Sequence, residues 1–253
     1  MPYYTFTIPK KSGRTRTIAV PDPELKAKQR ELLKEMQMAP TFWISKKAHG
    51  FARKRSILTN ASVHTGKMWI LNLDIEDFFP SITRSRLLAL YNLDLAFHNN
   101  SLPQGAPTSP FLSNIYMRDF DTTILGLVRQ YVSDDIEYTR YADDLTFSSN
   151  SYALEKVPLF VRTKLKTLDL ELNNEKTRLA GPGQRQEVTG LNINSGRPTI
   201  PKKYRRKMRA ITHRASVGWS ITEKQKAKLL GMISHISLCH PEEALKYRNI
   251  LLQ

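Results

Sequence analysis

Two adjacent aspartates, Asp143 and Asp144, lie in the segment RYADDLTFSS, which otherwise has the composition of a β-strand. A charged pair in a buried strand is costly unless it is paired or binds an ion. A turn on a wet surface is one explanation. A metal is the other, because Asp74 follows the apolar segment MWILNLDI and supplies a third carboxylate. Three carboxylates make a hard ligand set for Mg²⁺, and two such ions about 3.5–4 Å apart can support phosphoryl transfer.

The distribution of charge favours a polyanionic partner. The chain has 39 Lys and Arg residues against 23 Asp and Glu residues, a formal net charge of +16. Residues 1–55 and 197–228 are strongly basic, whereas residues 56–196 are slightly acidic. Basic flanks suit nucleic acid, and an acidic centre suits divalent cations. Solvated charge on ordinary helices is the alternative, although few acids balance the basic run from 201 to 214.

Other features exclude several classes of protein. Cys239 is the only cysteine, so the chain can form no internal disulfide and no cysteine-based zinc site. No apolar run approaches the roughly 20 residues that a membrane-spanning helix needs, and the first residues lack the apolar core of a secretory signal. We therefore expect a soluble protein of the cytoplasm that does not enter a membrane.

The elements that must position the aspartates follow from hydrophobic periodicity and turn signals. Asp22 and Pro23 predict the start of a helix, as its N-cap and first residue. Strands are expected at 3–8, 15–20, 68–75, 136–142, 145–149 and 187–194, and helices at 23–36, 85–93, 109–130 and 157–168 and in three segments after 202. This order predicts an α+β fold with an antiparallel hairpin, helices on one face of the sheet and an all-helical C-terminal lobe.

Four motifs, in this order along the chain, resemble those of reverse transcriptases. LNLDIEDFFPSI resembles a metal-binding palm strand, and LPQGAPTSPFLSN resembles the loop and helix that contact nucleotide and template. YADD resembles the catalytic hairpin, and LNNEKT resembles the later lysine-bearing motif. The resemblance implies a right-hand polymerase architecture with an antiparallel-sheet palm. It implies fingers at 1–66, joined by part of 82–110, a palm at 67–198 and a helical thumb at 199–253.

Two further segments are similar to bacterial retron reverse transcriptases. HGFARKRSILTNASVH contains the Asn-Ala-x-x-His pattern, and QEVTGLNIN contains the Val-Thr-Gly mark that precedes the thumb. Two features depart from the retron pattern. Retron enzymes commonly carry a helical segment before the first finger strand, which here begins almost at once, and the insert between FFPSI and LPQG is short.

The resemblance implies catalytic roles for four residues. Asp74, Asp143 and Asp144 would hold two Mg²⁺ ions, with the backbone carbonyl of Ile75 reaching the nucleotide-bound metal. Asp144 would contribute less directly than the other two. Lys176 would protonate the departing pyrophosphate as a general acid. Without the surrounding motif, Lys176 would be interpreted as a surface lysine.

The resemblance also implies a site for the dNTP. Phe79 would clash with a ribose 2′-OH, Gln104 would bind the sugar, and Gly105 would let the backbone approach the nucleotide. Lys11, or Lys10 in its place, and Arg16 would clamp the triphosphate. The alternatives are a core position for one of Phe78 and Phe79, which we assign to Phe78, an ordinary turn at PQGAP and a solvated hairpin tip.

Nucleic-acid contacts are expected from two regions. Asn60 and His64 would take a structural or RNA-positioning role near the template, and a buried, hydrogen-bonded histidine is the alternative. Thr189 and Gly190 would position the primer end or the priming RNA. The basic thumb would follow phosphates, with only part of it facing one duplex; its candidate residues are Lys202, Lys203, Arg205, Arg206 and Arg209.

The retron resemblance implies an RNA-directed DNA polymerase that copies part of its own structured noncoding RNA. Synthesis would begin at an RNA 2′-OH and give a branched RNA–DNA hybrid, msDNA, within an anti-phage defence system. The implied partners are the noncoding RNA, the hybrid, dNTPs and an effector protein. Another bacterial reverse transcriptase class, of the group II intron or diversity-generating type, and a non-catalytic RNA-binding scaffold are the alternatives.

Overall fold

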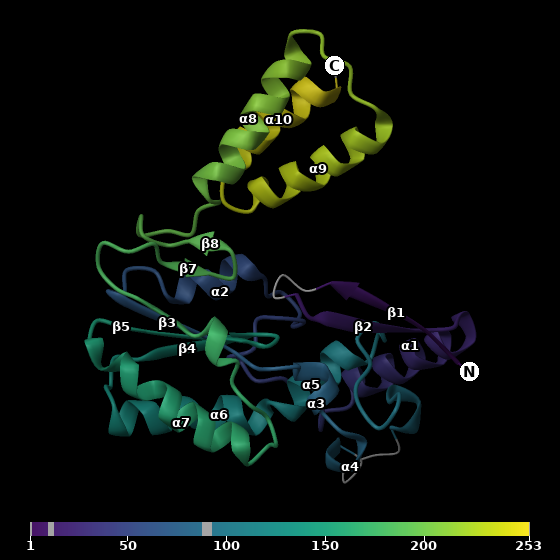
Figure 1. Ribbon diagram of the computed structural model, residues 1–253, viewed down its shortest axis with the longest axis vertical. Coiled ribbons are helices and arrows are strands. Elements are labelled where there is room, and N and C mark those ends of the chain that lie inside the picture. The colour runs from purple at the N-terminus through teal and green to yellow at the C-terminus, as the bar shows by residue number, and fades with distance from the viewer. Residues whose placement is uncertain (1, 10–12, 88–92, 253) are drawn as a thin grey trace.

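The computed structural model of this chain describes residues 2–9, 13–87 and 93–252 (Figure 1). Lys10 and Lys11, two of the expected triphosphate contacts, lie outside the described residues, as does much of the helix predicted at 85–93. Within the described residues, no helix is both long and apolar enough to cross a membrane.

The centre of the molecule is a four-stranded antiparallel sheet with the strand order β4-β5-β3-β6. Its strands are β3 (Trp69–Asp74), β4 (Glu137–Tyr141), β5 (Asp144–Ser149) and β6 (Arg178–Ala180). Apolar side chains such as Leu71, Leu73 and Phe147 are buried in one core with the helices α5 (Ser109–Tyr116), α6 (Arg118–Tyr131) and α7 (Val157–Lys166). Figure 1 shows α6 and α7 together on one side of this sheet, as the α+β prediction requires.

The N-terminal part forms a separate two-stranded hairpin and a helix. The strands β1 (Tyr3–Pro9) and β2 (Thr15–Pro21) pair antiparallel. Helix α1 (Pro23–Met38) begins as predicted, because the Asp22 side chain accepts a hydrogen bond of 2.8 Å from the Leu25 backbone. The Ala19 backbone donates to the Gln104 carbonyl at 2.9 Å, which joins the hairpin to the loop before α5.

The C-terminal part is helical. Helices α8 (Lys202–Ser216), α9 (Glu223–Ser237) and α10 (Pro241–Leu252) pack on one another and lie beyond the sheet in Figure 1. Their core continues into the small hairpin β7 (Glu187–Val188) and β8 (Leu191–Asn192) and into α2 (Ile57–Val63). The division into fingers, palm and thumb at 66 and 198 stays a prediction.

Two of the predicted elements differ in the structure. The helix expected at 109–130 is interrupted at Met117, a buried residue with φ −82° and ψ 0° that separates α5 from α6. The strand expected at 187–194 is a hairpin, because Thr189 and Gly190 have φ of 46° and 81° and reverse the chain. The remaining short elements are α3 (Phe78–Ser81), α4 (Arg84–Leu87), η1 (Asp94–Ala96), η2 (Tyr152–Lys156) and η3 (Asn174–Lys176).

Candidate active site

A cleft of about 730 Å³ lies between the N-terminal hairpin and the sheet. It brings together segments that are distant in sequence: β2, the end of β3, α3, the loop before α5, the β4–β5 turn and η3. The expected site residues that line it are Arg16, Asp74, Ile75, Phe79, Gln104, Gly105, Asp143 and Lys176.

Sheet register places the three aspartates next to one another. Asp74 ends β3 directly opposite Asp144, the first residue of β5. The Ile75 backbone donates to the Asp143 carbonyl at 3.0 Å. The turn between β4 and β5 is tight because Ala142 adopts a left-handed conformation with φ of 57°. Antiparallel pairing of two strand ends therefore gathers the carboxylates that the sequence separates.

The electrostatics of this site are unfavourable for so many negative charges. The pKa of the Asp143 carboxyl is raised, first by burial and then by the charge of Asp74. The pKa of Asp144 is raised to about 7, again first by surrounding protein and then by Asp143 and Asp74. Asp144 nevertheless exposes part of its surface to solvent. Raised pKa values in neighbouring carboxyls are typical of functional sites, and a bound cation would offset the repulsion between their charges.

Lys176 supplies a cation to this cluster. Its ammonium Nζ donates to both Asp74 carboxylate oxygens at 2.8 Å. Burial alone would lower the pKa of Lys176, but the hydrogen bonds to Asp74 and the charges of the three aspartates outweigh burial and raise the pKa. The lysine of the LNNEKT motif thus reaches the carboxylate of the LNLDIEDFF motif.

The donor set suits a divalent metal in its chemistry but not yet in its geometry. Oxygen ligands from Asp74, Asp143 and Asp144 are those that Mg²⁺ prefers. Across the described parts of the chain, however, no three acidic, His or Cys side chains are grouped closely enough to hold a metal ion. Lys176 donates one hydrogen bond to each Asp74 oxygen, so a metal at Asp74 would share this carboxylate with the lysine or displace it.

The opposite side of the cleft carries the residues expected to bind nucleotide. Phe79 is partly exposed and lines the cleft, whereas Phe78 is buried in the core. The Gln104 Oε1 atom is buried without a hydrogen-bond partner. Gly105 has φ of 134°, and a Cβ at this position would lie 2.7 Å from the Ala19 carbonyl oxygen. Glycine is therefore required here for the backbone contact with β2.

Sequence reasoning missed several residues that line the same cleft, among them Arg14, Ile18, Phe51 and Glu76. Ile18 lies two positions after Arg16 on β2 and Arg14 lies two positions before it, just ahead of the strand, so strand periodicity would have found them. Phe51 lies in the HGF segment and its ring centroid is 6.2 Å from that of Phe79. Glu76 accepts an ion pair from Arg14 at 2.8 Å, which connects the hairpin to the end of β3.

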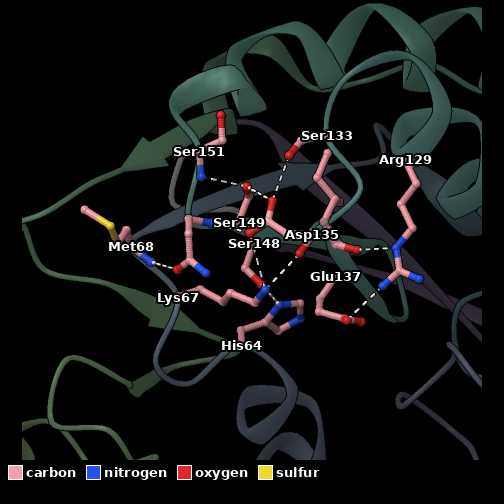
Figure 2. A network of polar contacts seen from close by, with 12 residues as sticks. His64, Lys67, Met68, Arg129, Ser133, Asp135, Glu137, Ser148, Ser149 and Ser151 are labelled. Carbon is pink, nitrogen blue, oxygen red and sulfur yellow. Dashed lines mark hydrogen bonds and ion pairs between the residues drawn. The ribbon is translucent and has the colours of Figure 1, made fainter.

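Asn60 and His64 are fully buried. The His64 ring contacts Ser148 Oγ and Thr139 Oγ1, each at 2.7 Å, and Figure 2 shows it directed at Ser148 of β5. Burial first, and then nearby positive groups, lowers the pKa of His64 to about 3. Neither side chain can touch nucleic acid in this conformation, so we correct the expected contact to a role in packing α2 against the sheet.

The Thr189–Gly190 turn lies beside α2. Asn60 Nδ2 donates weakly to Thr189 Oγ1, at 3.4 Å. Thr189 is partly exposed and Gly190 is exposed, so this turn remains accessible.

The basic residues of α8 divide into two groups. Lys202, Lys203 and Arg206 are exposed. Arg205 is partly buried and ion-paired to Glu243 of α10, with an Nε–Oε2 distance of 2.8 Å. Arg209 lies 3.8 Å from the same carboxylate. Arg205 therefore ties two thumb helices together, and the exposed group is better placed to meet phosphate.

A palm-like antiparallel sheet with clustered aspartates beside a nucleotide-sized cleft defines a nucleic-acid polymerase of the reverse transcriptase class. The chain belongs to the reverse transcriptase (RNA-dependent DNA polymerase) family, whose pattern it matches over residues 8–233.

Within that family the chain is similar to retron reverse transcriptases. It is 36% identical to the retron Mx65 reverse transcriptase of Myxococcus xanthus, over 96% of this chain and 62% of that protein. It is 35% identical to the retron Ec86 reverse transcriptase of Escherichia coli, over 86% of this chain and 71% of that protein. The chain thus spans only about two thirds of the length of these relatives.

Solved structures support the fold alone. A foamy viral protease-reverse transcriptase in complex with double-stranded DNA has a TM-score of 0.53 and 16% identity, over 93% of this chain and 36% of the other. Apo telomerase from Candida Tropicalis has a TM-score of 0.51 and 13% identity, over 79% of this chain and 55% of the other. The prediction of a right-hand polymerase architecture is confirmed at the level of the fold.

Proposed function

We propose that this chain is an RNA-directed DNA polymerase of the retron type. A primer hydroxyl attacks the α-phosphate of a dNTP, and pyrophosphate leaves. The observation that carries the proposal is the meeting of Asp74, Asp143 and Lys176 at one cleft, with Asp144 paired to Asp74 across the sheet. Family membership and the similarity to retron enzymes support the same reaction.

Asp74, Asp143 and Asp144, with the Ile75 carbonyl, are the residues that would hold the two Mg²⁺ ions. When bound, such ions activate the attacking oxygen and stabilise charge on the leaving group. For proton donation, Lys176 exchanges its hydrogen bonds to Asp74 for contact with the leaving group. Its freed ammonium then lies beside the cleft, where it can donate a proton to pyrophosphate.

The other cleft residues hold the dNTP. Arg16, with Lys11, attracts the triphosphate. Gln104 lines the cleft, and its buried, unpartnered Oε1 would turn toward the cleft to accept a hydrogen bond from the sugar hydroxyl. Phe79, which lines the cleft, rejects a ribose through a clash with its 2′-OH.

The retron similarity extends the proposal to the natural substrate. The template is a cognate noncoding RNA, and the primer is an RNA 2′-OH, so the product is branched msDNA. Contacts with this RNA are supported by the accessible turn at Thr189 and Gly190 and by the exposed basic side chains of α8. A defence role with an effector protein in the cytoplasm rests on the retron similarity only.

Primer extension tests the polymerase activity. The purified chain is given an RNA template, a DNA primer, dNTPs and Mg²⁺. We expect extension by the wild type and a loss of at least 10³-fold in Asp143→Asn, which removes the carboxylate charge that would hold the metal ions. The matched control is Asp134→Asn, which alters an exposed aspartate of the pair Asp134-Asp135, outside the cleft, and should leave the rate unchanged.

Equal extension by wild type and Asp143→Asn would contradict the proposed site. An inactive wild type that still binds RNA would favour the scaffold. A co-purifying hybrid that is cut by both RNase and DNase, with a branch that resists ordinary phosphodiesterases, would support the retron product.

A further inference from the structure

A fully buried ion pair lies beneath the turn that carries Asp143 and Asp144. Arg140, in β4, and Asp121, in the first turns of α6, expose at most 1% of their surface. The guanidinium donates to both carboxylate oxygens, from Nε to Oδ1 at 2.9 Å and from Nη2 to Oδ2 at 2.7 Å. The Tyr138 hydroxyl donates to Oδ1 at 2.7 Å. The pair therefore fixes β4 to α6 in one geometry.

The third nitrogen of the same guanidinium reaches the catalytic turn. Arg140 Nη1 donates to the Ala142 carbonyl at 3.1 Å and to Asn114 Oδ1 at 3.0 Å. Asn114 in turn donates from Nδ2 to the Gly50 carbonyl at 2.9 Å. A Cβ at position 50 would lie 2.5 Å from the Ala142 nitrogen. The residue before Asp143 is thus held from one side by a guanidinium and from the other by a glycine backbone.

This arrangement is hard to explain by stability. A buried ion pair is often no more stabilising than apolar side chains of the same volume, because both charges lose their hydration. Ala142, in contrast, needs support, since a residue other than glycine disfavours its left-handed backbone. A planar fork can bind a carboxylate and a carbonyl together, and a lysine ammonium cannot reproduce that geometry.

We propose that Asp121 and Arg140 are positioning residues that fix the Ala142 carbonyl and so present Asp143 and Asp144 to the reacting groups. Both are buried and neither lines the cleft, so they act through the turn rather than on the substrate. The inference rests on the proposed polymerase reaction, which supplies the role of the two aspartates.

The test compares two Arg–carboxylate pairs that both join α6 to β4. The double variant Asp121→Asn with Arg140→Gln keeps a hydrogen bond between the two side chains. The glutamine side chain at position 140, however, is too short to reach the Ala142 carbonyl. The matched control is Arg129→Gln with Glu137→Gln, at the other end of the same two elements, where the Nη2–Oε1 distance is 2.8 Å. Arg140→Lys is a second variant that keeps the buried charge beside Asp121 and loses only the fork.

Steady-state primer extension, a Mg²⁺ titration and thermal unfolding are measured on each full-length variant. We expect both Arg140 variants to lose at least tenfold in kcat, with less than a threefold change in the KM for dNTP and in template–primer affinity. The Mg²⁺ concentration for half-maximal activity should rise at least threefold. The control pair should match the wild type in all of these measurements.

Three results would overturn the proposal. One is a folded Arg140 variant with wild-type kcat and Mg²⁺ dependence. Another is a loss that appears equally in the control pair. The third is failure of both Arg140 variants to fold, which would assign the pair to stability alone. An inactive wild type would instead refute the polymerase reaction, so the two failures are distinguishable.

Discussion

At the scale of single residues, we propose that one aromatic ring of the cleft discriminates between sugars. Phe79 is partly exposed in the cleft, while its neighbour Phe78 is buried. The Phe51 ring packs near Phe79 and limits the directions in which it can turn away. Specificity of this kind arises from a clash with the wrong substrate.

Phe79→Ala should therefore admit ribonucleotides. We expect the ratio of kcat/KM for dCTP over CTP to fall by roughly 10–200-fold, the range for a steric difference in an enzyme pocket. Single-nucleotide incorporation with each substrate measures this ratio. Phe160→Ala removes a ring that stacks on Tyr131 away from the cleft and serves as the control. A ratio equal to that of the wild type would refute the assignment to Phe79.

The proposed catalytic residues were easier to predict from the sequence than the buried residues that position them. Asp74, Asp143 and Lys176 carry recognisable motifs at strand ends and a short helix, so sequence reasoning found them. Asp121 and Arg140 carry no such pattern. Their pairing depends on how α6 packs on β4, which no local spacing records.

At the scale of elements, His64 joins α2 to two strands of the sheet through Ser148 and Thr139. The pKa of this histidine is lowered to about 3, against an ordinary value of 6.5. The unfolded chain therefore takes up a proton near pH 6.5, whereas the folded protein resists protonation until about pH 3. Stability supported by neutral His64 is present above pH 6.5 and is lost as the pH falls below it.

Acidification from pH 7.5 to 5 should thus cost the wild type about 2 kcal/mol of unfolding free energy through His64. His64→Gln removes the titrating group. Between pH 7.5 and pH 5, the unfolding free energy of this variant should therefore fall by about 2 kcal/mol less than that of the wild type. Urea unfolding at both pH values measures the difference. His98→Gln, a change at a partly exposed histidine, is the control. An identical pH dependence in wild type and His64→Gln would contradict the low pKa.

Two of the predicted elements differ from the structure for local physical reasons, whereas α2 and β6 were not predicted. Neither glycine nor proline marks position 117, so nothing in the sequence indicates a break between α5 and α6. In EVTGLNIN, a β-branched threonine with φ of 46° is unusual, and strand composition on both sides concealed the turn. By contrast, the N-cap at Asp22 was predicted because its chemistry is local.

At the scale of the whole molecule, the net charge of +16 comes from residues 1–55 and 197–228, which lie outside the part of the chain that forms the central sheet. The exposed basic residues of α8 belong to the helical C-terminal part, which packs on β7, β8 and α2 through an apolar core. This core gives the basic helix a defined position relative to the palm-like sheet.

Changing Lys202, Lys203 and Arg206 to Ala should weaken binding to an RNA–DNA duplex in a salt-dependent manner. The slope of log affinity against log salt is negative, and each lost phosphate contact should reduce its magnitude by about 0.9. Fluorescence anisotropy from low to moderate salt measures the slope. Changing Lys156, Lys164 and Lys166 to Ala, around α7, removes the same charge elsewhere and should alter the slope little. Equal changes in both triple variants would indicate attraction by net charge only.

The hydrogen bond from the Ala19 backbone to the Gln104 carbonyl joins two ends of the cleft. On one side, β2 carries Arg16 toward the place proposed for the triphosphate. On the other, Gln104 lies at the place proposed for the sugar. Because the link is made by backbone, and Gly105 leaves no room between the two segments, a tilt of the hairpin must move Gln104 with it. We therefore expect the proposed contacts with the phosphates and with the sugar to move together.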